Sequence, residues 1–127
     1  MNLEKVVFGF FILLAATLNF GFVYGDPGDP EHHHVYEFFA AIVVNFIATV
    51  LKVGESTQIG ALHLATSLVA ILQLCAAAIV WFWVAYESQD ALGVRHTVAI
   101  VSLAAGALLA NLISVVMLII ETTLQRR

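Results

Sequence analysis

The stretch VVFGFFILLAATLNFGFVY at residues 6–24 carries no charged side chain and ends at the sequence GDPGDP of residues 25–30. A helix rises about 1.5 Å per residue, so roughly 20 apolar residues cross a hydrocarbon core about 30 Å thick. The two prolines and two glycines that follow cannot continue such a helix. This stretch therefore predicts a first membrane span that stops before Gly25.

Three further stretches have the same character, at about residues 35–53, 59–86 and 97–120. Glu37 and Lys52 lie near the two ends of the second stretch, where long charged side chains reach the interface. The third stretch ends in Trp81, Trp83 and Tyr86, which is typical of the aromatic belt at a membrane boundary. The sequence predicts an all-α polytopic membrane protein whose single domain, residues 1–127, is a four-transmembrane-helix bundle.

The composition excludes several classes of protein. Hydrophobic residues make up 61% of the chain and charged residues 11%, whereas roughly 25% of residues are charged in soluble domains. The net charge of -4 and the five Lys and Arg residues argue against nucleic acid as a partner, because phosphate binding needs a basic patch. A single cysteine, Cys75, excludes an intrachain disulfide.

The distribution of Lys and Arg predicts the orientation, because these residues are retained on the cytoplasmic side. With four spans, one side carries Lys5, Lys52, Arg126 and Arg127, and the other carries only Arg95. We therefore expect both termini to be cytoplasmic and an acidic surface to face outward, made by Asp26, Asp29, Glu31, Glu37, Glu87 and Asp90. A cleaved signal peptide is the rival interpretation of residues 6–24, but the run is long and lacks an Ala-x-Ala pattern before Asp26.

Polar residues fall on single faces of the predicted helices. At about 100° per residue, Glu37, Asn45 and Lys52 share one face of the second span, and His63, Ser67 and Gln73 share one face of the third. Two roles remain open for the asparagines, an interhelical hydrogen bond or contact with a permeating species. The predicted pore or polar face consists of Asn19, Glu37, Asn45, Lys52, His63, Ser67, Gln73 and Asn111.

Lys52, His63 and Glu121 are all predicted near the cytoplasmic side. They are interface anchors or ion-paired groups of neighbouring helices in one interpretation, and a cytoplasmic gate in the other. The fourth span also carries a small side chain at every fourth position, at Ser102, Gly106, Ala110 and Ser114. This ladder predicts a helix-packing seam, within one chain or between subunits, with a narrow polar pore wall as the alternative.

The predicted external loop combines carboxylates with three consecutive histidines, in the set Asp26, Asp29, Glu31, His32, His33 and His34. Such a mixture suits a divalent metal cation, the only cofactor the sequence suggests. The spacing matches no established metal motif, and a pH-responsive, cation-attracting vestibule and a plain solvated connector remain as alternatives.

Catalytic motifs are absent from the sequence. It contains no Gly-rich phosphate loop, no nucleophile elbow, no His-Glu-x-x-His and no paired carboxylates at a plausible site, so we expect no enzyme. No Asp or Glu lies near the middle of a span, which also argues against a proton-coupled small multidrug exporter.

Four stretches of the chain resemble a family of small uncharacterised proteobacterial membrane proteins. The resemblance implies an inner-membrane location in a Gram-negative cell and no assigned activity, so no functional residues are carried over. The stretches are MNLEKVVFGFF at residues 1–11, HVYEFFAAIVVN at 34–45, ATVLK at 48–52 and TQIGA at 57–61.

Two functions remain after these exclusions. The first is an ion channel or transport protein for cations, built as a homo-oligomer because four short helices enclose too little space for a pore. The second is a non-conducting accessory subunit that packs on a larger transporter or channel through the small-residue face of the fourth span. The expected partners are the lipid bilayer and either further copies of the chain or that larger transporter.

Overall fold

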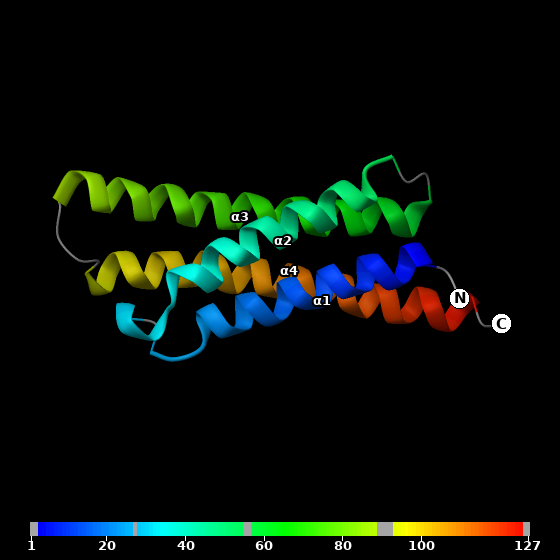
Figure 1. The fold of residues 1–127 in the computed structure, drawn as a ribbon, viewed down its shortest axis with the longest axis horizontal. Coiled ribbons are helices and arrows are strands. Elements are labelled where there is room, and N and C mark those ends of the chain that lie inside the picture. Colours follow the sequence, from blue (N-terminus) through cyan, green and yellow to red (C-terminus); the bar gives the residue numbers. More distant parts are fainter. Residues whose placement is uncertain (1–2, 27, 55–56, 89–92, 126–127) are drawn as a thin grey trace.

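A computed structural model describes residues 3–26, 28–54, 57–88 and 93–125 of the chain. Its four long helices run alternately in opposite directions, and both termini lie at the same end of the bundle, called here the terminal end (Figure 1). The described residues do not include Asp90 of the predicted acidic surface, nor Arg126 and Arg127, which served to predict the orientation. The elements are α1 (Leu3–Val23), the 3-10 helix η1 (Pro30–His32), α2 (Val35–Lys52), α3 (Gln58–Ser88) and α4 (Val94–Gln125).

All four long helices have the length and apolar character that crossing a membrane requires, so the predicted all-helical four-span architecture is confirmed. The largest difference in boundaries is at α4, which begins at Val94 and ends at Gln125 rather than at about residues 97 and 120. Counting apolar residues finds only the part of a helix that lies in lipid. The helices α3 and α4 are each about 45 Å long, which exceeds a hydrocarbon core of about 30 Å.

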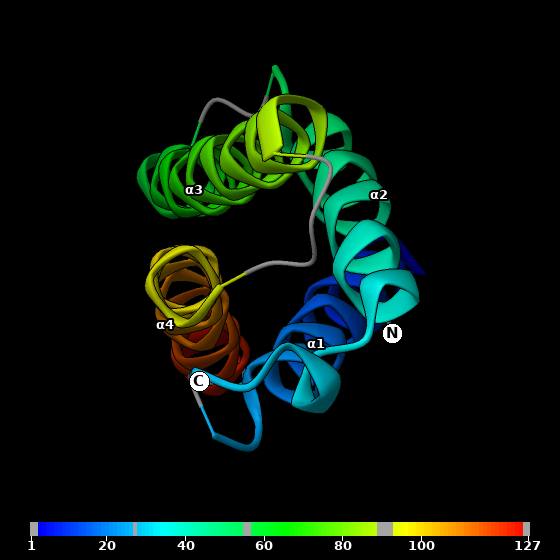
Figure 2. The same ribbon diagram turned by 90° about the vertical axis from the view of Figure 1, so that its left-hand side faces the viewer.

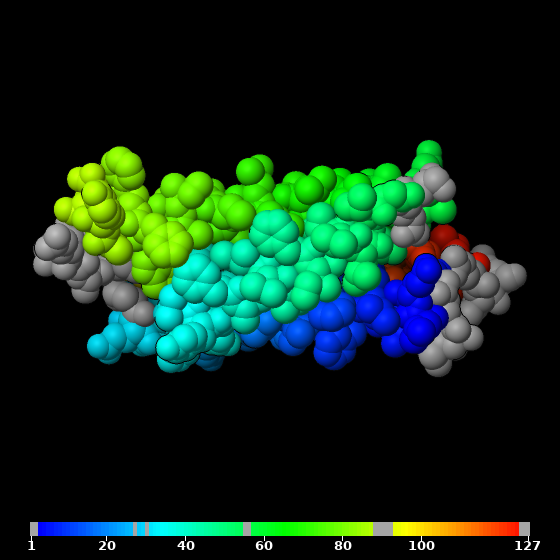
Figure 3. Space-filling model, turned by 45° about the horizontal axis from the view of Figure 1, so that its top comes forward, coloured from blue at the N-terminus to red at the C-terminus, as the bar shows by residue number. Residues whose placement is uncertain are grey.

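The helices form a ring in which α1 packs on α2 and α4, and α3 packs on the same two helices (Figure 2). In the space-filling view, α2 crosses the face between α1 and α3 (Figure 3). Alanine fills much of the centre, since Ala41, Ala70, Ala77, Ala104 and Ala107 are fully buried. Apolar burial gains little between helices in lipid, so these small side chains stabilise the bundle by allowing close backbone approach.

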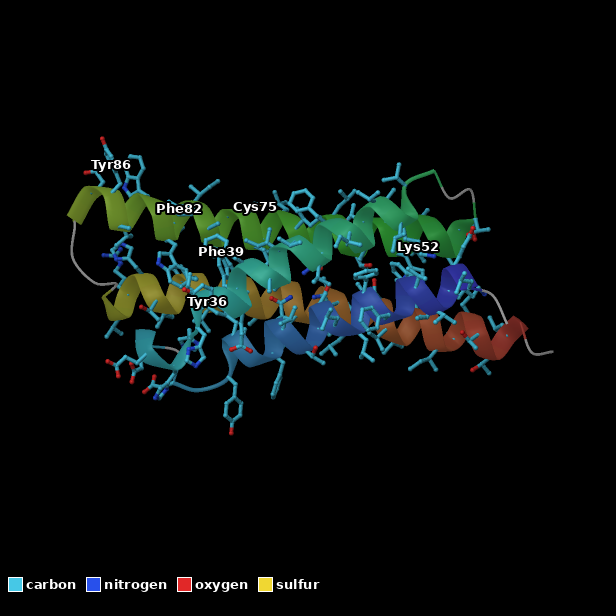
Figure 4. The ribbon with its side chains drawn as sticks, viewed as in Figure 1. Tyr36, Phe39, Lys52, Cys75, Phe82 and Tyr86 are labelled. Atoms are coloured by element: carbon cyan, nitrogen blue, oxygen red, sulfur yellow. The ribbon has the colours of Figure 1, made fainter. Side chains whose placement is uncertain are left out.

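An aromatic cluster lies inside the bundle toward the end opposite the termini. The ring of Phe22 lies 4.9 Å from that of Phe38 and 6.0 Å from that of Trp81, and the last two are 5.3 Å apart. We call these three residues the aromatic seal. Trp81, predicted in the interfacial belt, packs against the core of the bundle, whereas Trp83 and Tyr86 are exposed. Figure 4 shows Tyr86 on the outer side of α3. Side chains two positions apart on a helix point about 200° apart, so Trp81 and Trp83 cannot share a face.

Candidate functional site

Ionisable side chains from all four helices meet at the terminal end. The Lys5 ammonium of α1 lies 2.7 Å from Oε1 of Glu121 on α4. The other carboxylate oxygen, Oε2, lies 3.7 Å from Nε2 of His63 on α3. Lys52 of α2 joins the group through Phe8, because its Nζ lies 4.3 Å from the centre of that ring. We call these five residues, Lys5, Phe8, Lys52, His63 and Glu121, the end cluster.

Phe8 is the centre of the end cluster. It is 1% exposed, and its ring also makes an edge contact with His63 at a centroid distance of 4.9 Å. A desolvated ammonium over an aromatic face contributes roughly 2 kcal/mol. Lys52 is only 6% exposed, so it does not extend to water as a simple interface anchor does. Figure 4 shows it where α2 reaches the terminal end of the bundle. The ring therefore holds the two basic side chains of α2 and α3 together.

Burial makes the end cluster costly. His63 is fully buried and Glu121 is 7% exposed. Charged groups at this depth are expensive in a membrane protein and are by default markers of a functional site. The four ionisable members comprise two ammonium groups, one imidazole and one carboxylate, so positive charge predominates among them.

A second group of polar side chains fills the bundle between the end cluster and the aromatic seal. Asn19, Asn45 and Asn111 are each at most 1% exposed, so they face the interior of one chain rather than lipid. The same is true of Ser67 and Ser114, which are fully buried. We call this group the polar interior, and it consists of Asn19, Asn45, Ser67, Gln73, Asn111 and Ser114.

Much of the hydrogen-bonding capacity of the polar interior is unused by the protein. Within the described residues, neither amide atom of Asn19 or Asn111 has a hydrogen-bond partner, and the Asn45 carbonyl, Ser67 hydroxyl and Gln73 carbonyl oxygens also have none. The Asn45 amide is satisfied on one side, since its Nδ2 donates to Ala41 O at 2.8 Å. An unmet buried polar group costs roughly 1–3 kcal/mol. Water is the usual partner of such groups in protein interiors.

The polar interior follows the end cluster along the helix axes. On α4, ten residues separate Asn111 from Glu121, which corresponds to about 15 Å. On α2, Asn45 lies about 10 Å from Lys52 by the same rise per residue. At the other end, Asn19 precedes Phe22 of the aromatic seal by one helical turn. Cluster, polar interior and seal thus follow one another through the bundle.

The small-residue ladder on α4 lies mostly against α3 of the same chain. Ser114 hydrogen-bonds to Thr66 of α3. Gly106 meets the Gln73 side chain, which a Cβ at this position would displace. Ala110 is buried, and Ser102 is exposed. The structure therefore places three rungs of the predicted seam inside one chain and leaves Ser102 on the outside.

Glu37 stands apart from the other predicted polar-face residues. Its carboxylate lies against Gly21 of α1, near the aromatic seal. It is not fully buried, unlike Asn45 on the same helix. The helical period correctly groups polar residues on a face, but it does not show that the face turns inward within a single chain rather than toward further copies.

The histidine loop uses its rings to bind the backbone. His33 is 5% exposed, and its two ring nitrogens lie against the carbonyl oxygens of Phe22 and Asp26. His32 Nδ1 accepts the Asp26 N–H at 2.8 Å, and its Nε2 lies 3.4 Å from Asp29 Oδ2. Gly25, with φ +110°, makes this turn possible, because a Cβ there would strike the His32 ring.

No metal site follows from this loop geometry. Across the described ranges of the chain, no three His, Cys, Asp or Glu side chains are grouped to hold a metal ion. The rings of His32 and His33 contact backbone atoms. Glu31 and His34 are exposed, and His34 directly precedes α2. Metal binding at these residues remains a prediction without geometric support.

The His33 contacts give a stability prediction. We expect His33→Ala to lower the free energy of unfolding by about 2 kcal/mol, since the buried Phe22 carbonyl oxygen and the part-buried Asp26 carbonyl oxygen lose the ring that lies against them. His34→Ala, which removes an exposed ring from the adjacent position, is the matched control and should change stability little. Unfolding of the purified variants in detergent micelles measures both, and equal effects of the two substitutions would contradict the role assigned to His33.

Sequence reasoning did not assign Lys5 or Phe8 to a site, whereas Glu121 was already grouped with Lys52 and His63. Lys5 served only to orient the chain, and Phe8 looks like any other apolar residue of its span. The available signal was topological, because an even number of spans places Lys5 and Glu121 on the same side of the membrane. Their contact depends on the register between α1 and α4, which packing determines.

A family model matches residues 32–122, a segment that includes α2, α3 and most of α4. Three ionisable members of the end cluster, Lys52, His63 and Glu121, lie within this segment, whereas Lys5 and Phe8 precede it. No curated protein and no solved structure matches the chain. The chain belongs to the matched family, which is described as a family of unknown function (DUF6394).

Proposed function

We propose that this protein is a membrane transport protein that carries protons through the polar interior of a single four-helix bundle. The observation that supports this best is the set of buried amide and hydroxyl groups that find no partner among the described residues, located between the end cluster and the aromatic seal. Such groups hold water molecules in protein interiors, and hydrogen-bonded water relays protons without an open pore.

The end cluster favours the proton over other cations. A metal cation passing this level would have to displace the Lys5–Glu121 ion pair, whose atoms lie 2.7 Å apart, and to pass the Lys52 ammonium over the Phe8 ring. A proton instead has the His63 ring and the Glu121 carboxylate as successive carriers, with Nε2 and Oε2 3.7 Å apart. Proton pathways in membrane proteins are commonly built from carboxylate and histidine side chains.

Each end of the proposed pathway has its own closure. The aromatic seal blocks it near Asn19, and the Lys5–Glu121 ion pair with the Phe8 ring blocks it at the terminal end. Transport therefore requires small movements of both. Because the polar residues lie within one chain, this proposal does not need the several copies that a pore between subunits requires; homo-oligomerisation remains a separate expectation.

The proposed location is the inner membrane of a Gram-negative cell, with both termini in the cytoplasm. The distribution of Lys and Arg supports this orientation, and the proteobacterial resemblance supports the membrane. The terminal end carries Lys5 and Lys52 together with Glu4 and Glu121, while Asp26, Asp29, Glu31, Glu37 and Glu87 lie at or near the other end. An acidic outer surface concentrates protons and other cations at the entrance. We propose transport rather than catalysis.

An outer groove favours a second function, that of an accessory subunit. The groove has a volume of about 260 Å³ and lies between α1 and α4, where Ala16 and Thr17 provide small side chains. Small residues on a lipid-facing surface allow a helix of another membrane protein to approach closely. The remaining lining residues are Leu13, Phe20, Leu108 and Leu112.

Proton uptake by liposomes separates the two functions. Purified protein is reconstituted with a pH-sensitive dye inside, and a potassium gradient with valinomycin sets a negative interior potential. We expect the interior to acidify faster than in protein-free liposomes, because the potential drives protons along the polar interior. If acidification matches protein-free liposomes, at both directions of the gradient, transport is contradicted and the accessory role is favoured.

A further inference from the structure

A pocket of about 300 Å³ opens at the terminal end between the start of α1 and the end of α2. One carboxylate, that of Glu4, and one ammonium, that of Lys52, line it together with apolar side chains. It lies outside the polar interior, and the proposed transport function does not use its carboxylate. The full lining is Leu3, Glu4, Val7, Phe8, Leu51 and Lys52.

The pocket lies at the ends of two candidate membrane spans, the level at which lipid headgroups are expected. Leu3 begins α1 and Lys52 ends α2, so both mark the boundary of their apolar spans. Leu3 is 74% exposed and Leu51 is 42% exposed, which gives the pocket an apolar rim facing the hydrocarbon side. Its volume is at the lower end of the range for ligand pockets, roughly 300–1,000 Å³, and suits a headgroup rather than a whole lipid.

Lys52 is unusually placed for an interface lysine. A lysine that only anchors a helix extends toward water, but this side chain is 6% exposed and its ammonium lies over the Phe8 ring. The ammonium is thereby fixed in direction at one wall of the pocket. Glu4, one turn before Phe8 on α1, supplies the opposite charge at the same pocket.

We propose that this pocket binds the headgroup of a zwitterionic phospholipid with a primary ammonium, phosphatidylethanolamine. The lipid phosphate accepts hydrogen bonds from the Lys52 ammonium, and the lipid ammonium donates to the Glu4 carboxylate. The apolar rim contacts the glycerol and the first methylenes of the acyl chains. A purely anionic headgroup would place negative charge beside Glu4, and a choline headgroup has no N–H to donate.

Thermal unfolding of the delipidated full chain in detergent tests this inference. Phosphatidylethanolamine, phosphatidylcholine, phosphatidylglycerol and inorganic phosphate are added separately at equal concentration. A ligand that binds only the folded state raises Tm, so we expect phosphatidylethanolamine to raise it most. An equal rise with all three lipids, a larger rise with phosphatidylglycerol, or the full rise with inorganic phosphate would each overturn the proposal.

Variants separate binding from folding. Glu4→Gln should remove the preference for phosphatidylethanolamine over phosphatidylcholine, whereas Glu31→Gln, an exposed carboxylate at the other end of the bundle, should retain it. Lys52 also belongs to the end cluster, so its variants are read by lipid retention in native mass spectrometry. Lys52→Gln should lower that retention, and Lys52→Arg should restore it. Unchanged preference in Glu4→Gln contradicts the site. Proton uptake is a separate readout, so failure of transport does not decide lipid binding.

Discussion

Replacing Glu121 with glutamine is expected to lower the free energy of unfolding by about 3 kcal/mol, the low end of the range for breaking a buried ion pair. The carboxylate is the common partner of Lys5 and His63, at 2.7 and 3.7 Å. Without it, the ammonium and the imidazole remain close together with no negative charge between them. The Lys5 side chain is 21% exposed, so water compensates in part, which is why the low end applies.

Unfolding in detergent micelles measures this loss, with Glu87→Gln as the control because Glu87 is exposed at the other end of α3. The double variant Lys5→Gln/Glu121→Gln should be more stable than Glu121→Gln alone, since the remaining charge is removed. Two results would contradict the ion pair between α1 and α4. In the first, Glu121→Gln loses less free energy of unfolding than Glu87→Gln. In the second, the loss in the double variant equals the sum of the losses in Lys5→Gln and Glu121→Gln.

Asn111→Leu is expected to change stability and transport in opposite directions. Leucine has a similar size and removes an amide that the described residues leave to water, so no protein hydrogen bond is lost and stability should rise by about 1 kcal/mol, the low end of the cost of an unmet buried group. The same change interrupts the hydrogen-bonded path. Loss of one such step raises the barrier enough to lower proton flux by about tenfold.

Ser102→Leu is the matched control for Asn111→Leu, because it adds a similar side chain on the exposed side of the same helix. It should change neither stability nor flux appreciably. A loss of stability in Asn111→Leu would contradict the polar interior, because it would mean that the Asn111 amide has partners that stabilise the fold.

The four helices were predictable from the sequence because lipid imposes a simple rule of length and polarity. The grouping of Asn45 with Lys52, and of His63 with Ser67, was also predictable, since the helical period alone determines a shared face. What those faces meet was not predictable. Inward-facing polar residues and residues at an interface between copies give the same pattern along one chain.

The end cluster shows the same limit more clearly. Lys5 and Glu121 lie at opposite ends of the sequence, and their 2.7 Å contact follows from how α1 and α4 pack. Phe8 has no polar atom to mark it, yet it joins Lys52 to His63. The packing of Trp81 against the core likewise depends on Phe22 and Phe38, which reach it from two other helices.

The central claim is that protons pass through the interior of one bundle, and paired flux measurements on two leucine variants test it most directly. Asn111→Leu and Ser102→Leu are reconstituted at equal protein density beside the wild type, and dye acidification is followed under one potassium gradient. The account predicts about a tenfold lower rate for Asn111→Leu and a wild-type rate for Ser102→Leu. Equal rates in all three proteins would contradict it.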